Sequence, residues 1–186
     1  HARQFKKLRR QHRKLENEHN DVEFVFDDQR PKSFDWLITT KRAQYHATCK
    51  HDVLAPDWVS ALLDRLRRDD YTDLGVYLST LSANGRPIAA ELNIKGRGLL
   101  HGWLVAYDPE FSSYSPGHQV ILHILENMPQ HGLTTYDAGP GSYEYKKYWV
   151  NACSPIGVGD LRGDRSSAAS TQVLDFLEKA LPARGG

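Results

Sequence analysis

One stretch, residues 99–130, constrains the fold more than any other part of the chain. It begins with an apolar run typical of a strand (LLHGWLVAY), continues through a polar segment with Ser, Pro and Gly (SSYSPGH), and ends in an amphipathic helix pattern (QVILHILENMPQ). The free N–H groups and the dipole at the start of a helix favour a bound anion. The stretch therefore predicts a strand–loop–helix unit that can hold an anion, although the same residues also suit an ordinary capped helix start.

The segments around this stretch predict a mixed sheet. Strand patterns at residues 74–81 and 87–95 are separated by Asn84-Gly85, which supplies the positive φ angles of a tight hairpin. A further strand pattern follows at residues 133–138, and a strand–helix–strand unit of this length favours parallel pairing. The sequence therefore predicts an α+β fold whose mainly antiparallel sheet becomes parallel near one edge. The other predicted elements are a short strand at residues 22–26 and helices at residues 1–18, 31–48, 56–68, 143–149 and 170–181.

The opening helix is strongly basic. Its first fourteen residues carry seven Lys or Arg and no acidic residue. Cations at a helix N-terminus are disfavoured by the helix dipole. The pattern is consistent with a solvated helix face or with a surface that contacts an anion.

Composition bounds the class of protein. A chain of 186 residues with 40% hydrophobic residues suits a single domain over residues 1–186, in which residues 165–186 form a last helix and a frayed tail. The net charge of +1 points to no nucleic-acid or membrane partner, and no apolar run is long enough to span a membrane. Cys49 and Cys153 lie far apart, which suits a reducing cytoplasm. The chain starts at His1 rather than Met, so we expect it to be the C-terminal part of a longer protein.

Candidate catalytic side chains gather after the last predicted strand. Asp137 ends that strand, and a Gly-rich turn leads to Tyr145 and Lys146. A carboxylate, a phenol and an ammonium can serve as base, acid and charge stabiliser. Asp137 could equally cap the turn while the tyrosines pack. The helix at residues 31–48, with Trp36, Lys41, Gln44 and Tyr45, could line a substrate mouth or simply be amphipathic.

Other reaction classes lack their motifs. The nine histidines form no HxH or HExxH pattern, so the sequence predicts no metal site. A nucleophile elbow (GxSxG), a P-loop and a dinucleotide fingerprint are also absent.

Several stretches together resemble the GNAT N-acetyltransferase superfamily, in particular its CelD-like branch, which is linked to cellulose and exopolysaccharide biosynthesis. They are FKKLRRQHRKLE, FDWLITTKRAQY, LSTLSANGRPIAAELNI, LHGWLVAYDPEFSSYSPGHQVILHIL and YDAGPGSYEYKKYW, and they cover residues 3–150. The resemblance implies α/β/α layers and a central sheet that splays between two strands, with the pantetheine arm of acetyl-CoA or another acyl-CoA in the cleft and no metal.

The resemblance also implies which residues contact the donor. The backbone of one strand would bond the pantetheine arm, and the loop before the next helix would face the pyrophosphate. The strand positions are Leu104, Val105 and Ala106, and the loop positions are Ser115, Gly117, His118 and Gln119.

The YKKYW stretch is also similar to the Fem-type aminoacyl transferases, which use aminoacyl-tRNA and carry two copies of the domain. In that family a lysine of this motif stabilises negative charge, and Lys146 is the matching position. This similarity implies a tRNA donor as an alternative, and a possible second GNAT domain upstream. A non-catalytic module that binds CoA or a partner enzyme is a third reading.

The expected reaction is direct attack of an amine or a sugar hydroxyl on a thioester, with a small-molecule or sugar-linked acceptor in polysaccharide or cell-envelope biosynthesis. Proximity in the cleft supplies much of the rate. Asp137 or Glu91 would accept the proton, and Tyr145 would protonate the leaving thiolate because the two pKa values are similar. Nucleic acid is expected as a partner only if the donor is a tRNA.

Overall fold

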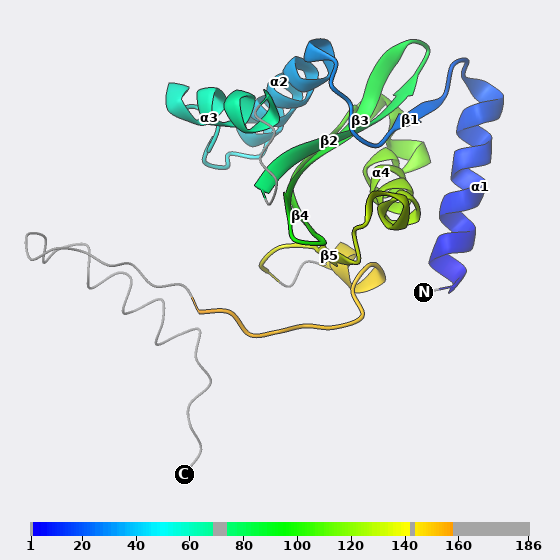
Figure 1. The fold of residues 1–186 in the computed structure, drawn as a ribbon. Coiled ribbons are helices and arrows are strands. Elements are labelled where there is room, and N and C mark those ends of the chain that lie inside the picture. The colour runs from blue at the N-terminus through cyan, green and yellow to red at the C-terminus, as the bar shows by residue number, and fades with distance from the viewer. Residues whose placement is uncertain (1, 69–73, 142–143, 158–186) are drawn as a thin grey trace, which may run out of the picture. The chain divides into compact units, whose positions relative to one another are not determined.

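The structure, a computed structural model, describes residues 2–68, 74–141 and 144–157 (Figure 1). Contacts divide the chain into two units, His1–Asn151 and Ala152–Gly186. The fold described below is that of the first unit. Of the second unit only residues 152–157 are described, and they are exposed without helix or strand. The predicted helix at residues 170–181 and the tail segment 165–186 lie outside the described residues, so a single domain over the whole chain stays a prediction.

A five-stranded sheet in the order β1-β2-β3-β4-β5 forms the centre of the first unit. Its first three pairings are antiparallel and the last, β4 with β5, is parallel, which confirms the predicted mixed sheet. Asn84 and Gly85, both with positive φ, form the predicted hairpin turn. The strands are β1 (Glu23–Val25), β2 (Leu74–Ala83), β3 (Arg86–Gly96), β4 (Leu99–Tyr107) and β5 (Thr135–Asp137).

The helices agree with the predicted positions, apart from the segment after β4. Its residues 109–114 form a 3-10 helix, η1 (Pro109–Tyr114), in place of the predicted irregular loop. Asp108 explains this helix, because its side chain accepts a hydrogen bond from the N–H of Glu110 and Pro109 suits a first helical position. The other helices are α1 (Ala2–Glu18), α2 (Pro31–Ala47), α3 (Asp57–Arg68), α4 (Pro116–Asn127), η2 (Met128–His131) and η3 (Glu144–Tyr148). None of those described is long and apolar enough to cross a membrane.

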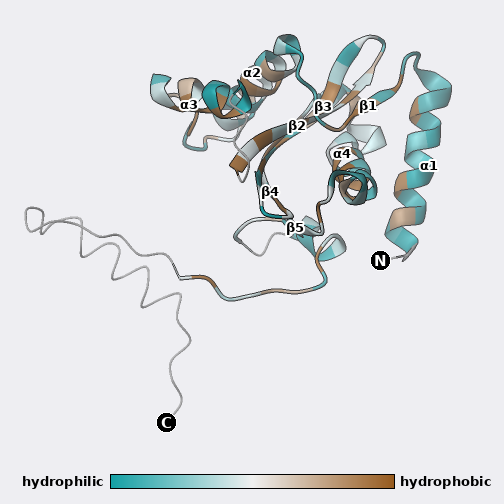
Figure 2. Ribbon diagram, in the orientation of Figure 1, coloured by the Kyte–Doolittle hydropathy of each residue, from teal (hydrophilic) through white to brown (hydrophobic). Residues whose placement is uncertain are grey.

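Two apolar clusters, one on each face of the sheet, confirm the α/β/α layers. Strand alternation divides neighbouring residues between them: Ala89 of β3 packs with α1 and α4, whereas Ala90 packs with α2 and α3. Figure 1 shows α4 and α1 on one side of the strands and α2 and α3 on the other. In Figure 2, α1 is hydrophilic along most of its length, since it buries only a narrow stripe that includes Leu8 and Leu15.

Two irregularities of β4 shape the side of the sheet that α4 covers. Leu92 of β3 pairs with Leu104, but Asn93 pairs with Gly102, so Trp103 is an extra residue in β4. This bulge places Gly102 and Val105, three residues apart, on the same face of the sheet. In addition, β5 pairs only with residues 99–101 of β4, so within the described residues the rest of that edge of β4 has no strand beside it. This open edge arises because β5 ends at Asp137, and the splay between two strands stays a prediction.

Candidate functional site

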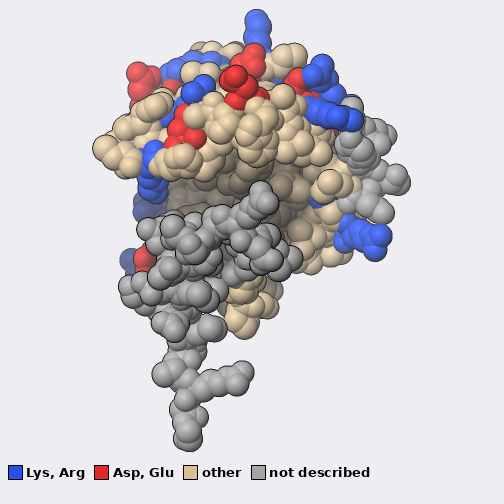
Figure 3. All heavy atoms as spheres, turned by 90° about the vertical axis from the view of Figure 1, so that its left-hand side faces the viewer, with Lys and Arg blue, Asp and Glu red and all other residues tan. Residues whose placement is uncertain are grey.

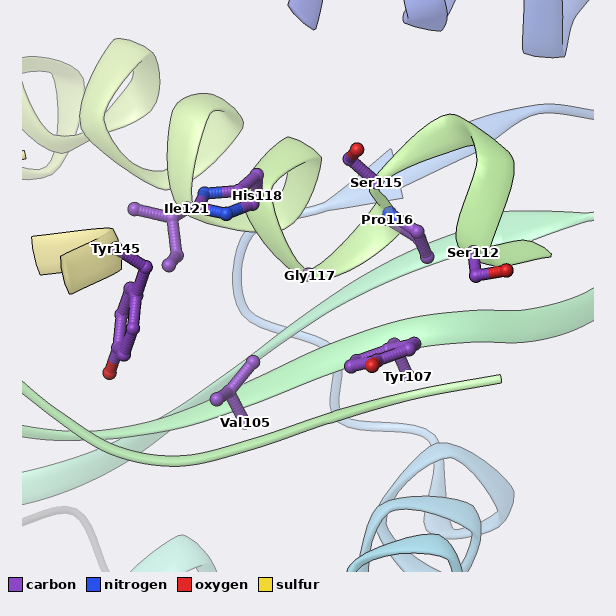
Figure 4. A pocket seen from close by; sticks show the side chains of 9 residues that line it. All are labelled: Val105, Tyr107, Ser112, Ser115, Pro116, Gly117, His118, Ile121 and Tyr145. Carbon is purple, nitrogen blue, oxygen red and sulfur yellow. The ribbon is translucent and has the colours of Figure 1, made fainter. Parts of the chain in front are cut away.

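A cavity of about 350 Å³ lies between the first turn of α4 and the open part of β4. Figure 4 shows the side chains of Val105 and Tyr107 on β4, with the first turn of α4 facing them. The cavity brings together five of the residues predicted from the sequence, which come from β4, the loop, α4 and η3. The full lining is Val105, Tyr107, Ser112, Ser115, Pro116, Gly117, His118, Ile121 and Tyr145.

The backbone of β4 presents alternate residues to its open edge. The N–H of Asp108 donates to the carbonyl of Ile88 on the β3 side at 2.8 Å. Because backbone groups alternate along a strand, Leu104 and Ala106 also face β3, and Val105 faces the open edge. Of the three strand positions expected to bond a pantetheine arm, only Val105 has its backbone groups on that edge.

Helix α2 occupies part of the same edge. Lys41 Nζ donates to the carbonyl of Val105 at 2.8 Å, and Gln44 Nε2 donates to the carbonyl of Tyr107 at 3.2 Å. Burial lowers the pKa of Lys41. These side chains belong to the helix for which the sequence allowed either a substrate mouth or a plain amphipathic role, and the structure places them against β4.

The first turn of α4 has fewer free N–H groups for an anion than the sequence predicted. The carbonyl of Ser115 accepts from the N–H groups of His118 (3.0 Å) and Gln119 (3.1 Å), and Pro116 has no N–H. Gly117 therefore has the N–H group of this turn that lacks a hydrogen-bond acceptor among the described residues. A Cβ on Gly117 would lie 3.5 Å from the Tyr107 ring, so the loop backbone approaches β4 closely.

Two of the predicted loop residues hold α1 rather than a ligand. Ser115 Oγ accepts a hydrogen bond from Gln11 Nε2 at 3.0 Å, and in Figure 4 the hydroxyl points away from Val105 and Tyr107. Gln119 is fully buried and its Nε2 donates to the carbonyl of Leu8 at 2.7 Å. The expectation that Gln119 faces a pyrophosphate is therefore corrected, because its side chain is used to fasten α1 to α4.

His118 lines the cavity beside an aromatic group from η3. Its ring centroid lies 6.2 Å from that of Tyr145 and 5.6 Å from that of Trp149. Burial lowers the pKa of His118, and the nearby Lys7 of α1 lowers it further. A neutral imidazole at this position contributes packing and a polar nitrogen, but no fixed positive charge.

Asp137 and Lys146 are both engaged in fixing the turn after β5. Asp137 accepts hydrogen bonds from His101 Nδ1 and from the N–H of Gly139, each at 2.8 Å, and the bond from His101 holds its pKa below the usual range. Lys146 is 8% exposed and its Nζ donates to the carbonyls of Gly139 (3.0 Å) and Pro140 (2.6 Å). These contacts place η3, and with it Tyr145, at the cavity.

Glu91 differs from Asp137 in its burial, its pKa and its hydrogen-bond partners. It is 2% exposed, and burial raises its pKa to about 7. Tyr136 donates a hydrogen bond of 2.6 Å to its Oε1, and Oε2 has no partner within the described part of the chain. A carboxyl group with a pKa near neutrality is suited to accept a proton. The structure thus separates the two carboxylates between which the sequence could not choose.

Tyr136 is a residue that sequence reasoning missed. The signal that could have found it is Gly102, a lone glycine within an apolar strand, since such a glycine often marks the close approach of another group.

Metal ligands do not gather in one place. Residues 2–68, 74–141 and 144–157 contain no group of three or more His, Cys, Asp or Glu that could hold an ion. Cys49 and Cys153 are free and exposed.

The chain is similar to several solved structures. An aminoglycoside acetyltransferase from an uncultured soil metagenomic sample, in complex with sisomicin, is similar with a TM-score of 0.50 and 13% identity over 77% of this chain and 96% of that one. A Trypanosoma brucei acetyltransferase gives a TM-score of 0.48 and 19% identity over 76% of this chain and 100% of its own. A tandem GNAT protein from the clavulanic acid biosynthesis pathway gives 0.47 and 16% over 69% of this chain, which spans 42% of that protein.

Comparison with protein families assigns the chain. No curated protein matches it. The family model for the acetyltransferase (GNAT) domain matches residues 2–147, which include the whole sheet, the cavity and η3 up to Lys147. The chain therefore belongs to the GNAT acetyltransferase family.

Proposed function

We propose that this protein transfers an acyl group from acyl-CoA to an amine or a sugar hydroxyl. The observation that carries the proposal is the cavity at the open edge of β4, which lies against the first turn of α4 and has Tyr145 on its wall. A thioester held along this edge would have a phenol and a buried carboxyl group of near-neutral pKa close to the reacting atoms.

The donor would be held by three features. The N–H of Val105 at the open edge would bond the pantetheine arm, since Lys41 already bonds the carbonyl, and the N–H of Gly117 with the dipole of α4 would face the phosphates. The lining contains no Lys or Arg. Further positive charge would come from α1, whose Lys7 is close enough to His118 to lower the pKa of the imidazole.

In the reaction, the acceptor nitrogen or oxygen attacks the thioester carbonyl, forms a bond to that carbon and expels the CoA thiolate. Glu91 accepts the proton of the attacking group through a water molecule, because the carboxyl is buried behind Val105. Tyr145 gives a proton to the thiolate. Asp137 stays ionised in its contact with His101, and Lys146 keeps the turn that carries Tyr145 in place.

The CelD-like resemblance supports an acceptor in polysaccharide or cell-envelope biosynthesis. The similarity to the Fem-type transferases supports a second GNAT domain upstream of this chain, and the two free cysteines suit a cytoplasmic location. The stretch from Trp103 to Lys146 contributes most to the CelD-like resemblance, and it includes the second half of β4, η1, α4, β5 and the start of η3.

Calorimetry with acetyl-CoA and with longer acyl-CoAs, followed by turnover with a panel of amines and sugars, tests the proposal. We expect binding of at least one acyl-CoA, and release of CoA in the presence of the correct acceptor. Absence of binding would contradict the proposal. Binding without turnover on any acceptor would favour a non-catalytic module.

One observation favours an aminoacyl-tRNA as the donor instead. Arg3, Lys6, Arg10 and Arg13 are exposed on α1, and none of them forms an ion pair with another described residue. By contrast, Figure 3 shows acidic and basic residues interspersed on the side of the molecule that carries α2 and α3. A tRNA donor predicts binding that falls steeply with salt, because each phosphate contact releases counterions. Weak salt dependence together with acyl-CoA turnover would exclude this alternative.

A further inference from the structure

Three neighbouring strands meet at one point beneath α4. Tyr136 of β5 donates a hydrogen bond of 2.6 Å to Oε1 of Glu91 on β3, although β4 lies between these strands. The bond passes over Gly102. A Cβ on this glycine would lie 2.6 Å from both the Tyr136 hydroxyl oxygen and Glu91 Oε1, and 3.1 Å from Tyr136 Cζ. Any side chain at position 102 would therefore occupy the place of this contact.

The local irregularities of β4 make the contact possible. Pairing between β4 and β5 ends with His101 and Asp137, immediately before Gly102. The bulge at Trp103 then returns Val105 to the face that Gly102 occupies. Glu91 pairs directly with Val105, so the two side chains are neighbours on that face. Since Val105 lines the cavity, the carboxyl group of Glu91 lies directly behind the wall of the donor site.

The two oxygens of this carboxyl group are used unequally. Oε1 is held by Tyr136, whereas Oε2 is buried and has no partner in the described structure. A buried acceptor without a partner is costly, and a carboxyl group that served only to join strands would be expected to satisfy both oxygens. The side chains of this pair thus leave a single oxygen available for chemistry.

We propose that Tyr136 is a positioning residue that fixes Glu91 through Oε1 and leaves Oε2 as the atom that accepts the proton of the attacking group. This inference rests on the proposed acyl transfer. During the reaction the acceptor loses its proton to Oε2 through water, the acceptor–carbon bond forms, and the carbon–sulfur bond breaks. Tyr136 keeps its own proton throughout and transfers nothing.

Other groups around the pair are consistent with this role. Burial and the neighbouring Glu91 raise the pKa of the Tyr136 hydroxyl, and Tyr145 on η3 and Asp137 on β5 raise it further, so the phenol stays protonated as a donor. On β2 the residue opposite Glu91 is Ser79, which is uncharged. On the α4 side, His118 borders the same cavity with a lowered pKa. The pKa of Glu91 itself is set by burial, which raises it, and by the Tyr136 hydrogen bond, which lowers it.

The test compares Tyr136→Phe with the wild type over a pH range of about 5.5 to 9. Removal of the hydroxyl keeps the ring but removes the hydrogen bond that stabilises the ionised carboxyl, so the pKa of Glu91 rises. We expect the acidic limb of the kcat profile to move to higher pH, kcat at neutral pH to fall about tenfold, and KM for acetyl-CoA to stay within about twofold. Tyr77→Phe, a tyrosine of β2 packed against the same apolar cluster, is the matched control and should leave the profile unchanged.

Gly102→Ala provides an independent route to the same contact. It keeps both partners but places a methyl group where their hydrogen bond lies, and we expect a loss of kcat like that of Tyr136→Phe, with circular dichroism to verify the fold. An unmoved pH limb in a folded Tyr136→Phe variant would overturn the inference and leave the proposed function intact. Full activity of Glu91→Gln would also overturn it. Absence of acyl transfer in the wild type would overturn both.

Discussion

The imidazole of His101 donates a hydrogen bond of 2.8 Å to Oδ2 of Asp137, within the last residue pair that joins β4 to β5. The contact therefore lies where β5 ends. Oδ1 of the same carboxylate accepts from the N–H of Gly139 and so directs the chain into the turn before η3. One carboxylate thus connects the end of the paired strands to the element that carries Tyr145.

Replacement of Asp137 by Asn should affect stability more than chemistry. The side chain is 49% exposed, so solvent screens the pair and we expect a loss of less than about 1 kcal/mol in the free energy of unfolding. Because the pKa of Asp137 is lowered in the folded state, this contribution is present above the ordinary pKa near 3.8 and is lost as the pH falls through the lower folded value. Urea unfolding at about pH 3 and about pH 6 measures it. A kcat within about threefold of wild type is expected, and a loss of about a hundredfold would identify Asp137 as the base.

The raised pKa of Glu91 predicts that the protein loses stability as the pH rises, whereas the contribution of Asp137 is lost as the pH falls. A glutamate carboxyl group ordinarily has a pKa of 4.5, and in the folded protein that of Glu91 is about 7, so between these values the folded protein retains a proton that the unfolded chain has lost. The free energy of unfolding should therefore fall as the pH rises from about 4.5 to 7, by up to about 3 kcal/mol, and then level off. Urea unfolding of the wild type and of Glu91→Gln across this range tests it. Equal slopes for both proteins would show that Glu91 is not the titrating group.

Lys146 should matter for both the turn and the position of Tyr145. Lys146→Ala removes two hydrogen bonds to carbonyls of the turn, and we expect the free energy of unfolding to fall by about 1–3 kcal/mol. We also expect a lower kcat, because η3 loses its anchor. Lys147→Ala is the matched control, since the side chain of Lys147 is exposed and pairs with Glu144 of the same short helix. Comparable effects of the two substitutions would contradict the anchoring role.

The placement of α1 predicts a charge effect on donor binding. Lys7→Glu should raise KM for acetyl-CoA about fivefold at low salt, and the effect should shrink as salt is added. Acetyl-pantetheine lacks the diphosphate and adenosine phosphate, so its KM should not change. Lys32→Glu, at the start of α2, serves as the control for net charge. An equal change for both donors would show that Lys7 does not act on the phosphates.

The sequence predicted the elements well and their tertiary contacts less well, for physical reasons. Periodicity and turn residues are local, so the strands, the Asn84-Gly85 hairpin and the helix after β4 could be placed in advance. The segment predicted as a loop forms η1 because Asp108 caps it, and this signal is also local. Gln119 could not be assigned correctly, because its burial depends on α1, more than a hundred residues away in the chain.

The contact between Tyr136 and Glu91 illustrates the same limit. Nothing local relates a tyrosine of one strand to a glutamate of another that is not its neighbour in the sheet, and the glycine between them is visible only as an interruption in an apolar run. The sequence pattern made Glu91 and Asp137 equal candidates for the group that accepts the proton. Their difference comes from burial and from partners that belong to other elements.

The extra residue in β4 determines which face of the sheet each later residue of that strand occupies. If Trp103 paired with Leu92 in a regular ladder, Val105 would turn toward the layer of α2 and α3, and Leu104 and Ala106 would turn toward α4. Loss of the bulge would thus exchange the wall of the cavity with part of the opposite core, although the composition of the strand would not change. Deletion of Trp103, whose side chain is 40% exposed, would instead keep the other pairs of β3 and β4 and leave Val105 facing α4.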